Sequence, residues 1–219
     1  MEYISSIIEA SGAIVASSLS AFIAAGYIGK AFKSNITPQF HTYSDKKHDI
    51  HKMLRKAKNN IYIVTSIGDR FLEKYEKRIS EYLKKGVQLH FLIQQKTQYY
   101  ELEHYINANQ DFTNEFYDFI RKSVLEKLKK FQTEFPNQVE IKEFPFFLSA
   151  SYIGIDIEED ITTNNWLPHS AIQVMLYQYA VATRMCPITY FSFKDNQELF
   201  ESTANCILEM WNKGEPLRM

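Results

Sequence analysis

Residues 61–93 read IYIVTSIGDRFLEKYEKRISEYLKKGVQLHFLI, and this stretch decides the fold. Its two ends, 61–65 and 87–93, are short apolar runs rich in β-branched residues, which is typical of buried strands. The segment between them repeats apolar residues at helical spacing and closes at Gly86, a residue suited to the end of a helix. Strand, helix and strand with short connections predict a βαβ unit, in which the two strands are parallel.

The remaining predicted elements extend this unit in both directions along the chain. Apolar residues recur at helical spacing before it and again between residues 98 and 135, while three later runs are rich in strand-forming residues. The predicted helices lie at about 44–58, twice within about 98–135, at about 170–184 and after the capping pair Asp195 and Glu198, and the predicted strands are VEIKEF (139–144), SYIGIDI (151–157) and ITYFSF (188–193).

Composition narrows the class of protein. The 219 residues are 45% hydrophobic and 23% charged, which is ordinary for a globular chain. A formal net charge of -1 argues against nucleic acid as a partner, because phosphate binding usually requires a basic excess. Cys186 and Cys206 lack the spacing of a disulfide framework or a zinc site, so the main domain is expected to be cytosolic, and the sequence predicts no metal and no cofactor.

The N-terminal segment 10–29, ASGAIVASSLSAFIAAGYIG, contains no charged residue. As a helix it would span about 30 Å, which matches the hydrocarbon core of a bilayer. Acidic residues precede it and Lys30 and Lys33 follow it, so the positive-inside rule places the C-terminal domain in the cytoplasm. A transmembrane helix is therefore expected, with a signal peptide and a buried helix of a soluble protein as alternatives.

Small residues recur at every fourth position of this segment: Gly12, Ala16, Ser20 and Ala24. Ridges of small residues let helices approach closely in a membrane, so this one predicts self-association into a homo-oligomer. The alternative is that a segment rich in alanine and serine produces the spacing by chance.

Three stretches together resemble the phospholipase D-like superfamily: residues 48–94, the segment FPFFLSASYIGIDIEED (144–160) and residues 188–214. The resemblance implies an α/β fold, a single phospholipase D-like α/β/α sandwich preceded by one transmembrane helix. The expected organisation is a transmembrane helix in 1–34, a linker in 35–43 and a cytosolic phospholipase D-like domain in 44–219.

The resemblance also implies a degenerate active site. Active members carry a histidine, a lysine two residues later and an acidic residue five further on. The corresponding positions here are Ser149, Ser151 and Asp156, so only the acidic residue is retained. His169 falls in a loop expected over the same end of the fold, where it could line a pocket. The motif therefore implies no catalytic residue.

These features together predict a membrane-anchored, non-catalytic sensor or effector that binds an unknown ligand or partner protein. The architecture is similar to that of bacterial anti-phage defence effectors, which implies action at the inner membrane through helix self-association, with the bilayer as a partner. The alternatives are a phosphodiesterase, nuclease or phospholipase with an unconventional active site, and a structural scaffold that forms homodimers.

Overall fold

The computed structural model describes residues 41–42, 50–108, 110, 112–158, 166–181 and 185–217. The chain divides into two units, residues 1–39 and 40–219, and all the elements below belong to the second. In chain order they are β1 (His41–Thr42), α2 (Ile50–Leu54), β2 (Asn60–Thr65), α3 (Asp69–Leu83), β3 (Gln88–Gln94), α4 (Lys96–Ile106), α5 (Asn114–Glu134), β4 (Val139–Phe144), β5 (Ala150–Ile155), β6 (Ala171–Leu176), β7 (Pro187–Ser192), α6 (Gln197–Lys213) and β8 (Glu215–Pro216).

The strands form one mixed sheet of eight strands in the order β1-β7-β6-β5-β2-β3-β4-β8. Strands β2, β3 and β4 are parallel, and β2 pairs with β3 from Asn60↔Gln88 to Thr65↔Ile93. This pairing confirms the βαβ unit predicted from residues 61–93. On its other side β2 pairs antiparallel with β5, so the direction of the sheet changes at β2.

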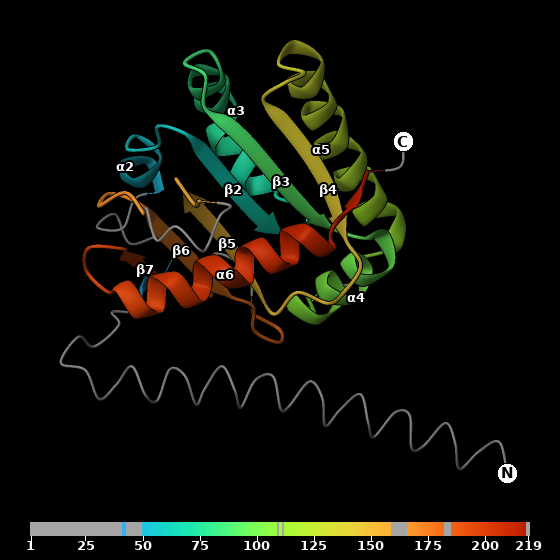
Figure 1. The fold of residues 1–219 in the computed structure, drawn as a ribbon. Coiled ribbons are helices and arrows are strands. Elements are labelled where there is room, and N and C mark those ends of the chain that lie inside the picture. The colour runs from blue at the N-terminus through green and yellow to red at the C-terminus, as the bar shows by residue number, and fades with distance from the viewer. Residues whose placement is uncertain are drawn as a thin grey trace, which may run out of the picture. The chain divides into compact units, whose positions relative to one another are not determined.

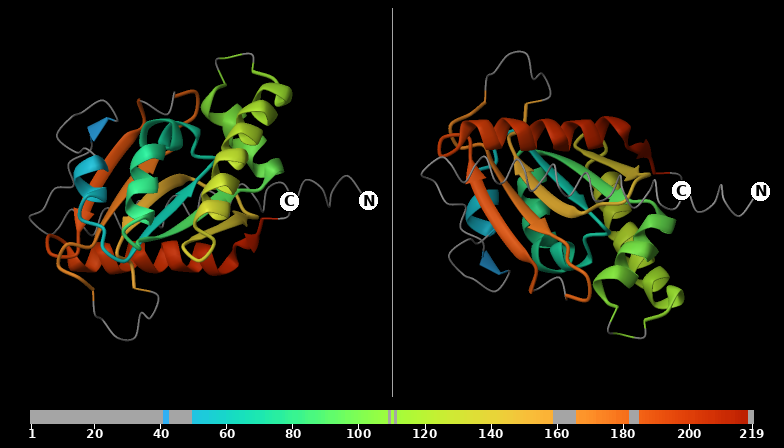
Figure 2. Two further views of the ribbon diagram at one scale, coloured as in Figure 1. Left: turned by 90° about the horizontal axis from the view of Figure 1, so that it is seen from above. Right: turned by 90° about the horizontal axis from the view of Figure 1, so that it is seen from below.

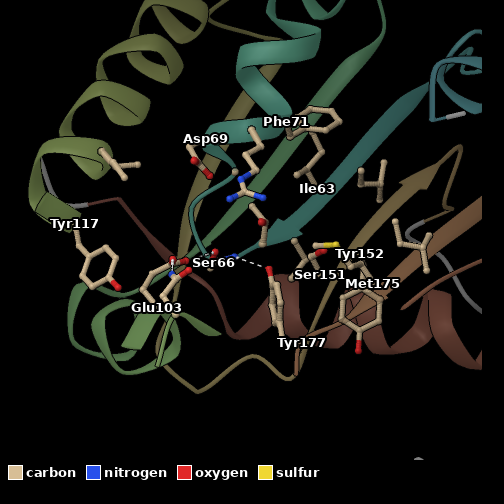
Figure 3. Close-up of a pocket in the computed structure, with 18 of the residues that line it drawn as sticks. Ile63, Ser66, Asp69, Phe71, Glu103, Tyr117, Ser151, Tyr152, Met175 and Tyr177 are labelled. Carbon is tan, nitrogen blue, oxygen red and sulfur yellow. Dashed lines mark hydrogen bonds between the residues drawn. The ribbon is translucent and has the colours of Figure 1, made fainter. Parts of the chain in front are cut away.

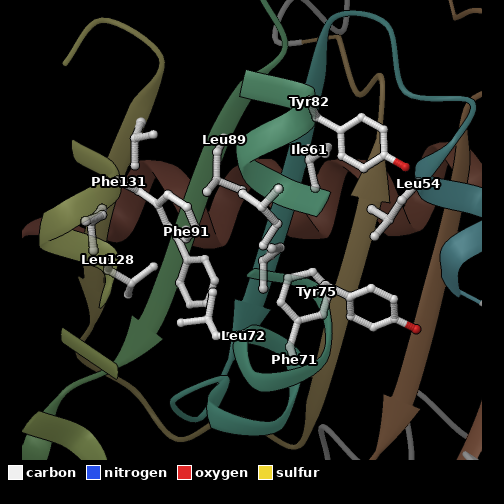
Figure 4. Packing of buried hydrophobic residues seen from close by; sticks show 14 of the residues in the cluster. Leu54, Ile61, Phe71, Leu72, Tyr75, Tyr82, Leu89, Phe91, Leu128 and Phe131 are labelled. Atoms are coloured by element: carbon white, nitrogen blue, oxygen red, sulfur yellow. The ribbon is translucent and has the colours of Figure 1, made fainter. Parts of the chain in front are cut away.

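Helix α3 packs on the sheet through the apolar face that its sequence predicts. Its buried residues follow the helical spacing from Phe71 to Leu83, and they lie against β2 and β3 together with α2 and α5 (Figure 4). Leu72, Leu89 and Phe91 in this core are at most 1% exposed. Each such buried side chain contributes about 1.5 to 3 kcal/mol to folding, so this face stabilises the βαβ unit.

Helix α6 covers the opposite face of the sheet, which makes the domain a three-layer arrangement (Figures 1 and 2). Phe200, Ile207 and Trp211 of α6 pack with Tyr62 and Leu92 of the central strands in a second core cluster. The two cores leave the central strands buried on both faces, as expected for parallel strands between helices.

The helix predicted at about 170–184 is wrong, because residues 171–176 form strand β6. Residues 171–174 are all buried, so this strand is covered on both faces near its start. A strand buried on both faces lacks the apolar and polar alternation of a half-exposed strand, and a short apolar run of this kind cannot be distinguished from a buried helix by periodicity.

The last helix is capped by Asn196 rather than by the predicted pair of Asp195 and Glu198. The Asn196 side chain accepts a hydrogen bond from the Leu199 backbone N–H at 3.1 Å. Asp195 instead accepts a hydrogen bond from the Ser192 hydroxyl in the preceding turn. Both residue types cap helices well, so the sequence alone did not distinguish between the neighbouring positions.

The expectation of a membrane anchor requires correction. No helix in the described part of the chain is long and apolar enough to cross a bilayer. The segment 10–29 and its ridge of Gly12, Ala16, Ser20 and Ala24 lie outside the described residues. A transmembrane helix, a lipid bilayer as partner and an inner-membrane location rested on the absence of charge in that segment, and they are not carried further.

Candidate ligand-binding cavity

A cavity of about 310 Å³ opens where β2 ends and α3 begins (Figure 3). This is the carboxyl end of a parallel strand, beside the point where the sheet changes direction, and open α/β sheets commonly bind ligands at such a position. Its volume lies at the lower end of the range for small-molecule sites. The described lining residues come from α2, β2, α3, the α4 and α5 region, and β5 to β7.

The floor of the cavity is one face of the sheet. Residues paired directly across neighbouring strands point to the same face, so Ile63, Ile153 and Gln173 form one row. Ser151, Met175 and Ile188 form a second row, which lies nearer to the end of β2. The floor is therefore largely apolar, with two polar side chains set into it.

The turn between β2 and α3 is shaped by Gly68. Its φ of +80° is in the left-handed region, and a Cβ atom there would lie 2.7 Å from Phe91 Cζ. Only glycine meets both conditions without strain. The tight turn brings the first residues of α3, Asp69 and Arg70, to the edge of the cavity.

A polar cluster joins this turn to α4. The Ser66 hydroxyl donates to Glu103 Oε1 at 3.1 Å, and the Asn107 side-chain amide donates to Glu103 Oε2 at 3.1 Å. The Ser66 backbone N–H donates to the Tyr177 hydroxyl at 3.3 Å, so Ser66, Glu103 and Tyr177 meet at the end of β2 (Figure 3). Burial, followed by the charge of Asp69, raises the pKa of Glu103 to about 7.

Buried groups behind the cluster hold Ser66 in place. The Ser66 carbonyl accepts from the Gln94 backbone N–H at 3.0 Å, and the Gln94 carbonyl accepts from Arg121 Nη1 at 2.8 Å. Arg121 also forms an ion pair with Glu143 of β4, and its side chain is only 6% exposed. This chain links β2, β3, β4 and α5 at one edge of the sheet, which orients the polar wall of the cavity.

Gln173 is a buried polar residue in the lining of the cavity. It is 6% exposed, and its side-chain carbonyl oxygen is buried without a hydrogen-bond partner among the described residues. On one side its row continues with the apolar residues Ile153 and Ile63, and on the other side it pairs with Tyr190 of β7. A buried carbonyl without a donor costs about 1 to 3 kcal/mol, so its presence in the floor of a cavity points to a ligand that supplies the donor.

The structure separates the residues that the degenerate motif groups in sequence. Ser151 is buried and lines the cavity, whereas Ser149 is exposed at the turn before β5. Asp156 lies just after the other end of β5, about five residues or roughly 16 Å along the strand from Ser151. His169 is beside Asp156, and neither lines the cavity.

Asp156 binds the turn that leads into β2. Its carboxylate accepts backbone N–H groups of Lys58, Asn59 and Asn60 at 2.7 to 3.2 Å, and His169 Nε2 lies 2.8 Å from its second oxygen. Its φ of 52° is a left-handed conformation, which aspartate tolerates better than most residues. These contacts assign Asp156 to the geometry of the loop rather than to a shared site with Ser151.

Several cavity residues were missed by the sequence analysis. Ser66, Gly68 and Asp69 follow a buried strand and open a helix, a position at which a polar residue is a signal for a site. Gln173 interrupts the apolar run AIQVML, and a polar residue in a buried run is informative. Glu103 carried no signal, because it is one of two glutamates in an amphipathic helix. No group of three or more metal ligands occurs among the residues that the structure describes.

Neither a protein-family model nor a curated protein sequence matches the chain. Among solved structures, it is similar to TrmBL2, which is described as an archaeal chromatin protein with a novel mode of DNA binding. The TM-score is 0.50 at 11% sequence identity, and the match covers 95% of this chain and 66% of that chain, just under two thirds. At this identity the likeness concerns the fold alone.

This comparison corrects two expectations. The fold is similar to that of TrmBL2, and the resemblance to the phospholipase D-like superfamily, drawn from three short stretches, is set aside. The argument against nucleic acid rested on a net charge of -1, and a similar fold occurs in a DNA-binding chromatin protein, so that argument is withdrawn. Net charge is a whole-chain sum, which does not reveal how charges are distributed over one surface.

Proposed function

We propose that residues 40–219 form a non-catalytic ligand-binding domain, a sensor whose ligand is a small organic molecule held in the cavity at the end of β2. The observation that carries the proposal is Gln173, a residue that lines a cavity of about 310 Å³ and whose buried side-chain carbonyl oxygen has no hydrogen-bond donor among the described residues. A polar group buried without a partner is costly, so a protein that needed only stability would place an apolar residue there.

The placement of the motif residues supports a binding role over hydrolysis. Ser151 and Asp156 lie at opposite ends of β5, and the Asp156 carboxylate is occupied by three backbone N–H groups. A nucleophile requires a base within hydrogen-bonding reach, and Asp156 cannot serve Ser151 from that position.

Thermal unfolding in the presence of a panel of small organic molecules tests the proposal. We expect at least one compound to raise the unfolding temperature of the wild-type protein and to lose this effect in Met175→Trp, which fills the cavity. Met185→Trp is the matched control, because Met185 is 57% exposed and does not line the cavity.

Mass spectrometry of the bound compound distinguishes binding from catalysis. A sensor returns the compound unchanged after prolonged incubation. Turnover that disappears in Ser66→Ala or Ser151→Ala would replace the sensor with an enzyme, and stabilisation that persists in Met175→Trp would place the ligand elsewhere.

A second candidate function is DNA binding through a basic edge of the sheet. The turns before β2 and before β3 meet at this edge, where the Gln88 N–H donates to the Asn59 carbonyl at 2.8 Å. We define the basic edge by five exposed cations, none of which forms an ion pair within the described residues: Lys52, Arg55, Lys56, Lys84 and Lys85. The DNA binding described for TrmBL2 gives this surface an anionic partner to test.

Fluorescence anisotropy with a labelled DNA duplex tests this candidate at two salt concentrations. Replacing Arg55, Lys84 and Lys85 with glutamine removes about three phosphate contacts and should weaken binding by about tenfold or more at low salt. The control Lys129→Gln/Lys130→Gln alters exposed lysines of α5 and should bind as the wild type does. Equal losses in both variants would indicate a general charge effect and remove the basic edge as a DNA site.

A further inference from the structure

The cavity has two polar poles, and the first is the carbonyl oxygen of Gln173. This atom is an acceptor, so its partner must be an N–H or O–H donor. The neighbouring floor residues Ile153 and Met175 offer none. A ligand that occupies this part of the cavity must therefore combine an apolar body with a donor at one end.

The second pole contains two carboxylates, Glu103 of α4 and Asp69 in the first turn of α3. The Ser66 hydroxyl donates to one Glu103 oxygen and the Asn107 amide donates to the other, and a carboxylate oxygen can accept a second hydrogen bond. Arg70 is the single cationic side chain among the described lining residues, and it is exposed. Acidic side chains therefore outnumber basic ones at this end.

An apolar and aromatic wall connects the two poles. Ile63 and Ile153 form the floor, and Phe71 and Tyr117 line the sides (Figure 3). Gln173 is two strands from β2, and Ser66 is three residues beyond the row of Gln173, so their Cα atoms are roughly 14 Å apart at ordinary sheet spacings. The side chains at both ends shorten the distance that a ligand must span.

We propose that the ligand is an organic cation, with a protonated amine or guanidine held by Asp69 and Glu103, an apolar body over Ile63 and Ile153, and a hydroxyl or amide donor on Gln173. This inference rests on the proposed ligand-binding function and adds the chemical class of the ligand. The protein groups that would contact the polar ends of the ligand, on Asp69, Glu103 and Gln173, are all hydrogen-bond acceptors. Aromatic side chains such as Phe71 and Tyr117 also favour a bound cation.

An anionic ligand is the rival, because the N-terminal turn of α3 and Arg70 both favour negative charge. The Asp69 carboxylate already lies in that turn and supplies the negative charge that a helix N-terminus prefers. The negative end of such a ligand would also face the carboxylates of Asp69 and Glu103. The observations therefore favour the cation.

Calorimetry with four compounds that share one aromatic body tests the class of ligand. Tyramine carries both a cation and a hydroxyl donor, phenethylamine lacks the hydroxyl, tyrosol lacks the charge, and 4-hydroxyphenylacetate carries a negative charge instead. We expect tyramine to bind most tightly, and 4-hydroxyphenylacetate to bind least tightly. Glu103→Gln should weaken tyramine by about tenfold or more, because it removes an ion pair in a partly buried site, while Glu101→Gln on the exposed side of α4 should leave binding unchanged.

Gln173→Leu tests the other pole. It should weaken tyramine about fivefold, the size of one net hydrogen bond, and leave phenethylamine unaffected. Gln173→Met provides the same test if the leucine variant does not fold. Tighter binding of 4-hydroxyphenylacetate, abolished by Arg70→Gln, would overturn the cation in favour of an anion.

The failure of this inference is distinguishable from failure of the proposed function. If none of the four compounds binds while another compound of the panel stabilises the wild type but not Met175→Trp, the cavity is a ligand site and the cationic class is wrong. If no compound of any charge gives that pattern, the ligand-binding function itself is wrong.

Discussion

At the scale of single residues, two acidic side chains have opposite roles. Glu103 faces the cavity, where burial and Asp69 make its ionised form costly. The Asp156 side chain is fully buried at the opposite end of the central strands, where backbone N–H groups donate to its carboxylate. In the proposed site the first would bind the ligand at a cost in stability, whereas the second is expected to increase stability.

Glu103 should make the free energy of unfolding depend on pH. Its pKa is about 7 in the folded protein and lies in the ordinary range near 4.3 when unfolded, so the folded state binds the proton more tightly. Stability should therefore fall as the pH rises from about 5 to 8, by up to about 3 kcal/mol.

Urea unfolding at pH 5 and pH 8 measures this dependence. The loss in the free energy of unfolding between pH 5 and pH 8 should be smaller in Glu103→Gln than in the wild type. Glu101→Gln should show the same loss as the wild type. Identical pH dependence in wild type and Glu103→Gln would exclude Glu103 as its source.

Asp156→Ala should lower the free energy of unfolding by about 2 to 4 kcal/mol, because it leaves three backbone N–H groups of residues 58–60 without their acceptor and places alanine at positive φ. Glu158→Ala is the matched control two residues later, and it should change stability by less than about 0.5 kcal/mol. Chemical denaturation compares the two. A loss as small as that of the control would show that the contacts of the carboxylate do not stabilise the fold.

At the scale of elements, the β2 to α3 turn connects the fold to the cavity. Gly68 permits the turn, Ser66 and Asp69 present polar groups from it, and Phe91 of β3 packs beneath it. The same turn therefore determines both the approach of α3 to the sheet and the shape of the site.

Gly68→Ala and Gly86→Ala form a matched pair that separates steric cost from conformational cost. Both glycines have positive φ, +80° and +89°, but only at Gly68 would a Cβ atom contact a neighbour, Phe91 Cζ at 2.7 Å. We expect a loss of about 1 kcal/mol at Gly86 and roughly 2 to 4 kcal/mol at Gly68 in urea unfolding. Equal losses would mean that Phe91 moves aside freely and that the turn is looser than its geometry indicates.

At the scale of the whole molecule, residues 40–219 form one unit with a single sheet and a core on each face. The cavity belongs entirely to this unit. Ligand binding and stability are therefore properties that this part of the chain should possess by itself.

A fragment of residues 40–219 should unfold in one cooperative transition and bind the same compounds as the full chain with the same affinity. Circular dichroism during thermal unfolding and calorimetry measure the two properties. A fragment that binds a hydrophobic dye and melts without a transition would show that residues 1–39 are needed for folding.

The sequence by itself determined the local elements. The apolar runs of 61–65 and 87–93 and the helical spacing between them predicted the βαβ unit correctly, because periodic burial and the handedness of short connections are local properties. The buried face of α3, from Phe71 to Leu83, was read from spacing alone. Strand β6 was misread, since its burial on both faces comes from elements distant in sequence.

Only the tertiary structure decided the site. It carried Asp156 away from Ser151 along β5, and it brought Gln173 of β6 and Glu103 of α4 to one cavity with Asp69 of α3. The distances between these residues along the sequence do not predict that they lie close together, because strand order is set by pairing across the sheet. The cost of burying Gln173 and Glu103 likewise arises from the surroundings that the fold assembles, so the residues that make the cavity a candidate site became visible only in three dimensions.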